Sequence, residues 1–456
     1  MTPAIPASKR PRRQWLNRPE MRLAAVVETS DGRVVPSQGV RIPYRRLLRA
    51  RVWHPLEDAV RVFILGIDGY LGWSLAQYLG ARGMDVGGCD ALLRRGWVAE
   101  VGSTSATPIL PMSERSVAYE ETFGKPLAYS EGDLCDYAFV ASCLESFKPD
   151  AIVHLGEMPS APYSMIDVEH CTFTHTNNLI GTINTLFAMR DICPDAHLVK
   201  LGTMGEYGTP NVDIPEGFFE IEFRGRKDRL PFPRQAGSWY HQTKVHDTNN
   251  VTFACKIWGL RSTDIMQGVV FGTRIDEMGD DPRLCTRFDF DQAFGTAINR
   301  YCAQSVAGHP LTVFGAGNQK RGFLPLRDSM QCLHLAITKP PESGEYRVFN
   351  QFEEVYDVTG LARKVKGVAE GLGLDVEIAN IENPRKEAET HYYNPDRQHL
   401  IDLGYEPSRD METEITVTLK DLIANRDRIE AHREALLPDI RWDGTRRKSA
   451  YLSKGA

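Results

Sequence analysis

The chain has 456 residues, of which 42% are hydrophobic and 25% are charged, a composition typical of a globular protein with one large domain or two coupled ones. A net charge of −6 argues against a general attraction to nucleic acid or to anionic membranes, and no apolar run is long enough to cross a bilayer. Nine cysteines without a CxxC pair, together with no signal-peptide pattern, predict reduced thiols in a cytoplasmic protein.

The first 58 residues are expected to form an N-terminal extension. Residues 9–13 are basic and contain proline, which predicts a solvated, disordered segment; an arm that binds nucleic acid or anions is the alternative. Residues 23–35 read as a hairpin around Asp31-Gly32, a dipeptide typical of a hairpin turn. The pattern does not indicate what this extension does.

A strand, a glycine-rich turn, a helix and a second strand come next. The apolar run at 61–65 predicts a buried strand, and the GxxGxxG spacing of Gly66, Gly69 and Gly72 opens a helix. Small residues let the backbone approach a pyrophosphate, whose charge the helix N-terminus stabilises. Asp90 ends the second strand, where a carboxylate can bond a ribose hydroxyl and repel a 2′-phosphate. This unit predicts a dinucleotide site that prefers NAD to NADP.

Strands and helices keep alternating up to about residue 270. Residues 91–124 show no clear periodicity, which indicates an insertion or a functional loop. The alternation predicts an α/β fold of the Rossmann type, a doubly wound parallel sheet with helices on both faces and ligands beyond the carboxyl ends of its strands. The further expected strands are 127–130, 151–155 and 196–201, and the expected helices are 137–147 and 172–191.

From about residue 271 the pattern loosens into short mixed elements. We expect a smaller mixed α/β C-terminal lobe that closes the substrate side, then a long helix over about 411–436 and a frayed basic tail. The predicted domains are the extension 1–58, an NAD-binding domain 59–270, a substrate-binding lobe 271–410 interleaved with it, and the C-terminal helix and tail 411–456.

A tyrosine and a lysine four residues apart form a second strong pattern. Tyr240 and Lys244 share one helix face, so the ammonium can lower the pKa of the phenol. Thr203 follows the strand at 196–201, and its hydroxyl can share a substrate proton with Tyr240. A solvated helix surface is the alternative for YxxxK alone. Together with the glycine turn, the pattern predicts a hydride-transfer site.

These motifs, in this order, resemble the extended short-chain dehydrogenase/reductase superfamily, which mainly modifies nucleotide sugars. Longer strings, spread over about 60–407, resemble the UDP-sulfoquinovose synthases, which make a sulfolipid head-group donor from UDP-glucose and sulfite with tightly held NAD. The strings are SAPYSMID at 160–167, LGTMGEYGTP at 201–210, YHQTKVHD at 240–247, QGVVFG at 267–272 and AETHYYN at 388–394.

The resemblance implies roles residue by residue. Thr203, Tyr240 and Lys244 would form the catalytic group, with Glu206 and His241 as weaker acid–base candidates. Arginine suits phosphate, so two arginines would face the UDP diphosphate or the uridine. The residues implied for NAD are Gly66, Asp68, Gly69, Tyr70, Leu71, Gly72, Asp90, Asp133, Leu134, Leu155, Gly156, Asn178, Tyr240, Lys244 and Gln267. Those implied for the nucleotide sugar are Tyr163, Thr203, Met204, Gly205, Arg321 and Arg327.

Two departures bear on the reaction. Sugar 4,6-dehydratases carry Thr-Asp-Glu where this chain has Thr203-Met204-Gly205, a pattern that the sulfoquinovose synthases share, so a standard 4,6-dehydratase is disfavoured. Those synthases read Gln-Arg where this chain has Met158-Pro159. Losing one cation beside a dianion would cost about 1.5–3 kcal/mol, so sulfite addition is the weakest step of the resemblance.

We therefore expect an NAD-dependent nucleotide-sugar enzyme that works through a transient 4-keto sugar, with UDP-glucose and sulfite as substrates. One alternative is an epimerase or a 5,6-dehydratase of a UDP-hexose that uses no sulfite. A second is a non-catalytic NAD- or sugar-binding regulator. No metal site is expected, and the resemblance implies a homodimer or higher homo-oligomer.

Overall fold

The structure is a computed structural model that describes residues 26–28, 34–36, 60–388 and 390–452. The chain divides into two units, Met1–Asp58 and Ala59–Ala456. In the first, strands β1 (Val26–Glu28) and β2 (Val34–Pro36) pair antiparallel, which confirms the predicted hairpin. Its predicted turn, Asp31-Gly32, and the basic segment 9–13 lie outside the described residues.

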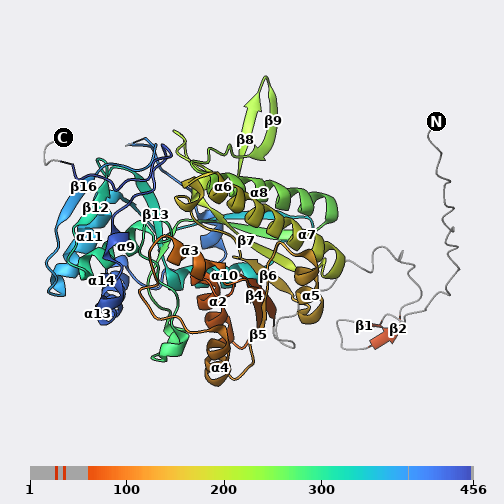
Figure 1. The fold of residues 1–456 in the computed structure, drawn as a ribbon. Coiled ribbons are helices and arrows are strands. Elements are labelled where there is room, and N and C mark those ends of the chain that lie inside the picture. The colour runs from red at the N-terminus through yellow and green to blue at the C-terminus, as the bar shows by residue number, and fades with distance from the viewer. Residues whose placement is uncertain (1–25, 29–33, 37–59, 389, 453–456) are drawn as a thin grey trace, which may run out of the picture. The chain divides into compact units, whose positions relative to one another are not determined.

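A seven-stranded sheet with the order β14-β10-β7-β6-β3-β4-β5 forms the centre of the second unit (Figure 1). Every neighbouring pair is parallel, which confirms the predicted Rossmann-type sheet. The strands are β3 (Arg61–Leu65), β4 (Asp85–Asp90), β5 (Ala128–Glu131), β6 (Ala151–His154), β7 (His197–Thr203), β10 (Arg261–Gln267) and β14 (Tyr346–Gln351).

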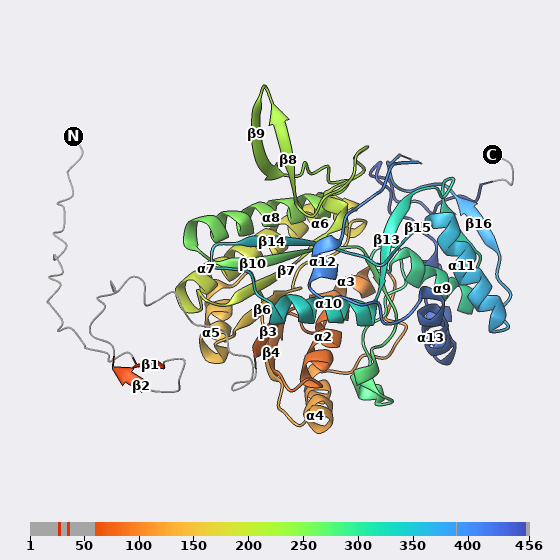
Figure 2. The same ribbon diagram turned by 180° about the vertical axis from the view of Figure 1, so that it is seen from behind.

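Helices cover both faces of this sheet because alternate side chains of a strand point to opposite sides (Figure 2). Val62 and Ile64 of β3 belong to the core cluster that α2 and α10 share, whereas Phe63 and Leu65 belong to the cluster of α5, α7 and α8. The predicted helix 172–191 consists of α6 and α7, joined by a π-helical turn at Thr176–Ile180. The helices are α2 (Tyr70–Gly80), α5 (Tyr137–Phe147), α6 (Val168–His175), α7 (Gly181–Ile192), α8 (Trp239–Trp258) and α10 (Leu326–Thr338).

The prediction that residues 91–124 lack regular structure is wrong. They contain helices α3 (Leu93–Glu100) and α4 (Met112–Phe123). α3 buries only Val98, whereas α4 buries a face that contains Met112, Ala118 and Tyr119 together with the charged Arg115. The single buried residue of α3 and the arginine within the buried face of α4 interrupt the apolar stripe by which an amphipathic helix is recognised.

The C-terminal lobe contains two small sheets, β11-β13-β15 and β12-β16, around its own apolar core. This confirms the predicted smaller mixed lobe. Because residues 59–456 form one compact unit, the boundaries near 270 and 410 stay proposals. The elements are β11 (Val269–Phe271), β12 (Leu311–Phe314), β13 (Lys320–Pro325), β15 (Glu354–Asp357), β16 (Ile378–Ile381), α9 (Ala297–Val306) and α11 (Val358–Gly371).

The end of the chain differs from the prediction of one long helix and a frayed tail. The helical stretch is broken after α13 (Met411–Ala424) into α14 (Arg426–Glu430) and η6 (Arg433–Leu436). The segment after it is ordered because its polar groups are bonded: Trp442 Nε1 donates to the Gly237 carbonyl at 2.9 Å, and Ile440 donates its N–H to the Gln292 side chain at 2.8 Å.

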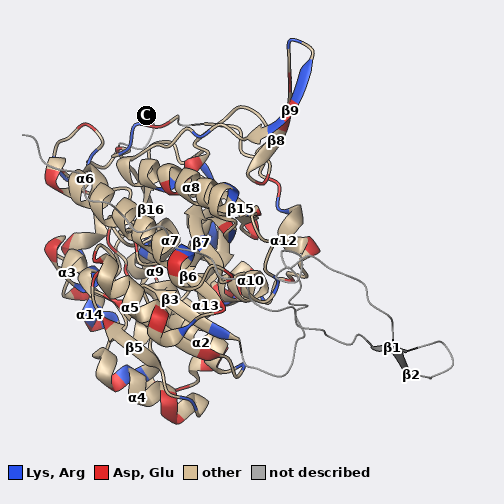
Figure 3. Ribbon diagram, turned by 90° about the vertical axis from the view of Figure 1, so that its right-hand side faces the viewer, with Lys and Arg blue, Asp and Glu red and all other residues tan. Residues whose placement is uncertain are grey.

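A hairpin that we did not predict projects from the second unit. Its strands are β8 (Phe218–Phe223) and β9 (Arg226–Pro231), and every residue of β9 is exposed. Figure 3 shows basic residues along β9. β9, with the sequence RKDRLP, lacks the apolar alternation that predicts a half-buried strand, whereas β8, with the sequence FFEIEF, has that alternation and could have been predicted.

Candidate active site

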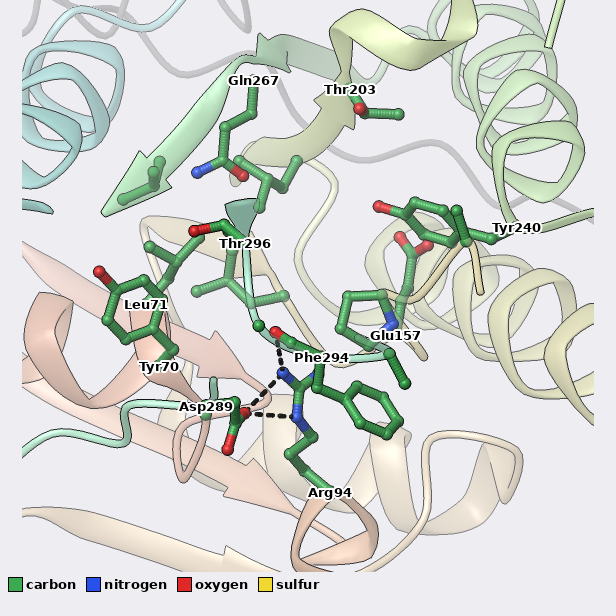
Figure 4. Close-up of a pocket in the computed structure, with 18 of the residues that line it drawn as sticks. Tyr70, Leu71, Arg94, Glu157, Thr203, Tyr240, Gln267, Asp289, Phe294 and Thr296 are labelled. Atoms are coloured by element: carbon green, nitrogen blue, oxygen red, sulfur yellow. Dashed lines mark hydrogen bonds and ion pairs between the residues drawn. The ribbon is translucent and has the colours of Figure 1, made fainter. Parts of the chain in front are cut away.

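A cavity of about 450 Å³ lies beyond the carboxyl ends of the parallel strands (Figure 4). Gly66 follows β3, Asp90 ends β4, Gly156 follows β6 and Thr203 ends β7, and all four residues line the cavity. The C-terminal lobe supplies further lining residues, among them Phe294. The cavity is therefore where ligands bind in a doubly wound sheet.

The glycine turn is shaped for close backbone approach. Gly66 has φ +87°, and a Cβ there would lie 2.7 Å from the backbone of Gly156. A Cβ on Gly72 would lie 2.2 Å from the carbonyl oxygen of Gly66. The N-cap of α2 is Gly69, which makes no side-chain cap, so the first N–H groups of the helix stay open to a ligand. This cradle fits the pyrophosphate of a dinucleotide.

Asp90 is held in place at the end of β4. Its carboxylate accepts the N–H groups of Asp68 at 2.9 Å and Leu92 at 2.7 Å. Burial, and after it the charge of Asp68, raises the pKa of Asp90 to about 6. Asp68 does not line the cavity: its side chain is paired with Arg95 at 2.7 Å and Arg115 at 2.5 Å.

Most residues predicted to hold NAD meet in this cavity. Of that set, all except Asp68 and Asn178 line it. Asn178 instead braces the loop after β6, because its side chain accepts the N–H of Met158 at 2.8 Å and donates to the carbonyl of Met158 at 3.2 Å. The lining residues of the set are Gly66, Gly69, Tyr70, Leu71, Gly72, Asp90, Asp133, Leu134, Leu155, Gly156, Tyr240, Lys244 and Gln267.

Tyr240 and Lys244 line the cavity from the first turns of α8, but their electrostatics differ from the prediction. The Lys244 ammonium donates to the carbonyl of Leu201 at 2.5 Å and lies 2.8 Å from the carboxylate of Glu157. Burial, followed by the negative charges of Glu157 and Glu206, raises the pKa of Tyr240 well above its usual range. The pKa of Tyr240 is therefore shifted upward, opposite to the predicted lowering.

Thr203 lines the cavity, whereas Glu206 does not. The two residues form a capping box around η3 (Met204–Glu206), in which Thr203 accepts the N–H of Gly205 at 3.1 Å and Glu206 accepts the N–H of Thr203 at 3.3 Å. Glu206 is fully buried and also accepts from the Thr248 hydroxyl at 3.1 Å. Glu206 therefore holds the backbone of Thr203 in place and does not face the cavity itself.

His241 lines the cavity, and its Nδ1 lies 3.0 Å from the Ser238 hydroxyl. Burial, then the charges of Arg385 and Arg321, lowers the pKa of His241 to about 3, so the ring is neutral at physiological pH. Met204, Gly205 and Tyr163, which were predicted to bind substrate, do not line the cavity. Tyr163 donates to Glu100 at 2.6 Å.

Arginines gather at the end of the cavity that the C-terminal lobe forms. Arg321, as predicted, lines it and is paired with Glu387 at 2.7 Å. Arg327 does not line it, because its guanidinium is engaged by Asp276 at 2.7 Å. Arg300 and Arg385, which the sequence reasoning missed, do line it.

Arg300 and Arg385 have no carboxylate within ion-pair distance in the part of the chain that the structure describes. Burial, the largest cause, lowers the pKa of both guanidinium groups, and Arg385 further lowers the pKa of Arg300. Like charges held together in a buried place favour an anionic ligand, because it would stabilise their charged forms.

Arg94 and Glu157 also line the cavity without having been predicted. Arg94 comes from α3, is paired with Asp289 at 2.7 Å and stacks over the ring of Phe294 at 4.1 Å (Figure 4). The position of Glu157 directly after a strand could have indicated a lining residue. Arg94 had no such signal, since its helix was not recognised.

Two searches of the described residues gave no further site. Within residues 60–388 and 390–452, no group of three or more histidine, cysteine, aspartate or glutamate side chains could hold a metal ion. Among the described helices, none is both long and apolar enough to cross a membrane.

Comparison with known proteins gives relatives over most of the chain. The profile of the NAD dependent epimerase/dehydratase family matches residues 62–350. UDP-sulfoquinovose synthase of Spinacia oleracea, named as chloroplastic, is 47% identical over 382 residues, which are 84% of this chain and 79% of that protein. UDP-sulfoquinovose synthase of Sulfolobus acidocaldarius is 46% identical over 396 residues, which are 87% of this chain and 100% of that protein.

Solved structures resemble the fold at much lower identity. The UDP-glucose 4-epimerase of Thermotoga maritima, solved with UDP-glucose, has a TM-score of 0.59 at 17% identity and covers 79% of this chain and 98% of its own. The UDP-glucuronic acid 4-epimerase of Bacillus cereus, solved with UDP-glucuronic acid and NAD, has a TM-score of 0.59 at 17% identity, with coverages of 80% and 99%.

Proposed function

The chain belongs to the NAD-dependent epimerase/dehydratase family, with relatives named UDP-sulfoquinovose synthase, and from this we propose that it converts UDP-glucose and sulfite into UDP-sulfoquinovose. The observation that carries the proposal is the single cavity in which a glycine cradle, Tyr240 with Thr203, and the arginines of the C-terminal lobe are combined. A dinucleotide, a sugar and a diphosphate each find the chemistry they require there.

The cradle and Asp90 would hold NAD, which when bound would supply the chemistry for taking a hydride from a sugar carbon and giving it back. Tyr240 is the residue assigned to take the proton of the C4 hydroxyl, and Thr203 shares that hydrogen bond. A 4-ketone would acidify C5–H, so that the C5 proton and the C6 hydroxyl could leave together as water. Sulfite would then add at C6 of the 5,6-ene and a proton at C5, and C4 would be reduced again to the alcohol.

The diphosphate of the nucleotide sugar is assigned to Arg300, Arg321 and Arg385. Arg300 is buried and Arg385 is partly buried, both without a carboxylate partner among the described residues, and Arg321 has one in Glu387. A diphosphate would offset this excess positive charge through charge-assisted bonds. Arg327, engaged by Asp276, is not part of this assignment.

The loop after β6 supports the alternative without sulfite. Met158 is fully buried in an apolar cluster, and Pro159 lines the cavity, so this wall offers no cation to a dianion. Binding of sulfite then depends on Arg94, which reaches the cavity from α3. Without sulfite, the same 4-keto intermediate would lead to an epimerase or a 5,6-dehydratase. The regulator alternative is weaker because Tyr240 and Lys244 both line the cavity.

Incubation of the purified protein with UDP-glucose and NAD, with and without sulfite, tests the proposal. We expect mass spectrometry to detect a sulfonated UDP-hexose only in the reaction that contains sulfite. The Arg94→Met variant is expected to lose this product while NAD stays bound. A reaction that releases an epimerised or dehydrated sugar whether or not sulfite is present would replace the lead function by its alternative.

A second copy of the chain is the partner we propose for the face formed by α7 and α8, which lie side by side in Figures 1 and 2. Phe253 and Ile257 of α8 are each 57% exposed, and Phe187 of α7 is 38% exposed. Trp239, at the beginning of α8, is 49% exposed. Large apolar side chains that share one surface are typical of an interface.

The double substitution Phe253→Asp and Ile257→Asp is expected to convert the dimer into a monomer, because two carboxylates would be desolvated at its centre. Light scattering coupled to size exclusion would measure the mass. Phe223→Asp on the projecting hairpin, at a residue that is 67% exposed, is the matched control and should leave the mass unchanged. A dimer that persists in the double variant places the contact elsewhere.

The compartment proposed for the enzyme is the cytoplasm. All nine cysteines lie within the described residues and are free, as is usual where thiols are kept reduced. The relative from Spinacia oleracea is named as chloroplastic, and a plastid is therefore the alternative compartment.

A further inference from the structure

Glu157 is a buried carboxylate in the wall of the cavity, and none of the proposed reaction steps uses it. It follows β6 by three residues, lines the cavity, and its side chain is only 2% exposed. Its carboxylate lies 2.8 Å from the ammonium of Lys244, whose side chain is 4% exposed. Figure 4 shows Glu157 beside Tyr240 at the cavity wall. An ion pair with both members buried has a large electrostatic effect on its neighbours.

The other titratable groups near this pair do not balance the charge of Lys244. Asp247, one turn after Lys244 on α8, is buried, and burial followed by the charge of Glu157 raises its pKa, which disfavours its charged form. His154 of β6 is also buried, and burial lowers its pKa to about 4, so its ring is neutral. Among the described residues, Glu157 is the carboxylate within ion-pair distance of Lys244, at 2.8 Å, and it therefore balances the charge of the ammonium.

Tyr240 is surrounded by charges from four elements. Glu157 from the loop after β6 and Glu206 from η3 raise its pKa beyond the effect of burial, while Lys200 of β7 and Arg94 of α3 lower it. On its own helix, the Lys244 ammonium lies 5.9 Å from the centre of its ring, and His241 is neutral. With Glu157 beside it, the Lys244 ammonium presents little net charge to the phenol.

We propose that Glu157 is a positioning residue that fixes the Lys244 ammonium and cancels its charge, so that Tyr240 keeps its proton until the nucleotide sugar enters the cavity. This rests on the assignment of Tyr240 as the proton-transferring residue. Removing the charge of Glu157 exposes the phenol to an unbalanced ammonium, which favours phenolate. Shortening the side chain by one methylene keeps the charge and largely keeps the balance.

The test is an absorbance titration of tyrosinate in the NAD-loaded protein, with the spectrum of Tyr240→Phe subtracted to isolate Tyr240. Glu157→Gln is expected to lower the titration midpoint by about one pH unit or more, as an unbalanced charge does at this range. Glu157→Asp keeps the negative charge, so its titration midpoint should stay close to that of the parent protein. Glu414→Gln, which removes a buried carboxylate that does not line the cavity, should leave the midpoint in place.

A double variant keeps the inference testable if Glu157→Gln folds poorly. Lys244→Met combined with Glu157→Gln removes both charges and should return the midpoint towards that of the parent protein. A midpoint unchanged in Glu157→Gln, or equally low in the double variant, would overturn the inference. The titration contains no sugar, so its result does not depend on turnover. A protein that makes no sulfonated product can therefore still show the shift of the titration midpoint in Glu157→Gln.

Discussion

Tyr240→Phe is expected to reduce turnover by about 100- to 10,000-fold, the range for loss of a general acid–base group, while NAD stays bound. The ring packs in the apolar cluster with Met158, Tyr163 and Phe294, and Phe preserves this packing. The N–H of Tyr240, which donates to the Ser164 hydroxyl at 3.0 Å, is also preserved. The loss would therefore report on the phenol oxygen alone. Steady-state rates and the NAD content of the purified variant measure both effects.

Tyr207→Phe is the matched control for this substitution. Its hydroxyl donates to Asn350 at 3.0 Å and is buried outside the cavity, so its removal should lower stability without a comparable loss of rate. An unchanged rate in Tyr240→Phe would refute the role of the phenol, and with it the reading of the YxxxK motif as a hydride-transfer site.

The parts of the site that follow strands could be predicted from the sequence. Gly66, Asp90 and Thr203 each stand at the carboxyl end of an apolar strand, and parallel strands bring these ends to one edge. Tyr240 and Lys244 were predictable as a pair because one helix face holds both. The local sequence pattern is sufficient to predict a site residue where its position at a strand end or on a helix face already determines its neighbours.

The remaining parts of the site depend on tertiary neighbours. Arg327 was predicted at the diphosphate, but Asp276 engages it, whereas Arg300 and Arg385 come from the C-terminal lobe without a local signal. The pKa of Tyr240 was predicted from Lys244 alone, whereas burial, and after it the charge of Glu157, which is distant in sequence, raises this pKa. Ion pairs between residues that are distant in sequence cannot be predicted from the periodicity of the sequence.

Lys200→Met is expected to reduce the free energy of unfolding by about 3–5 kcal/mol, the range for breaking a buried ion pair by removal of one partner. Lys200 of β7 stands opposite Asp264 of β10, at 3.1 Å, and both side chains are fully buried. Its ammonium also lies 3.8 Å from the buried Glu206. Methionine would leave two buried carboxyl groups near each other with Arg234, 3.9 Å from Glu206, as the nearest cation. Urea unfolding measures the change.

The pH dependence of this change has a definite sign. Burial alone would raise the pKa of Asp264, but the charge of Lys200 and the hydroxyls of Tyr346 and Thr248 outweigh burial and hold the pKa below its ordinary value. A lowered pKa contributes stability above the pKa of the unfolded chain, and this contribution is lost as the pH falls through the folded pKa. In Lys200→Met the pKa of Asp264 rises, so protonation relieves the buried charge and the stability difference from the parent narrows as the pH is lowered.

Lys227→Met provides the control for Lys200→Met. Lys227 is paired with Glu222 at 3.6 Å on the projecting hairpin, where the two side chains are 79% and 58% exposed. Exposed pairs contribute little, so this variant should unfold at the same urea concentration as the parent. If Lys200→Met also unfolds like the parent at neutral pH, Asp264 is protonated in the native protein, and the ion pair between β7 and β10 does not stabilise the sheet beneath Thr203 and Glu206.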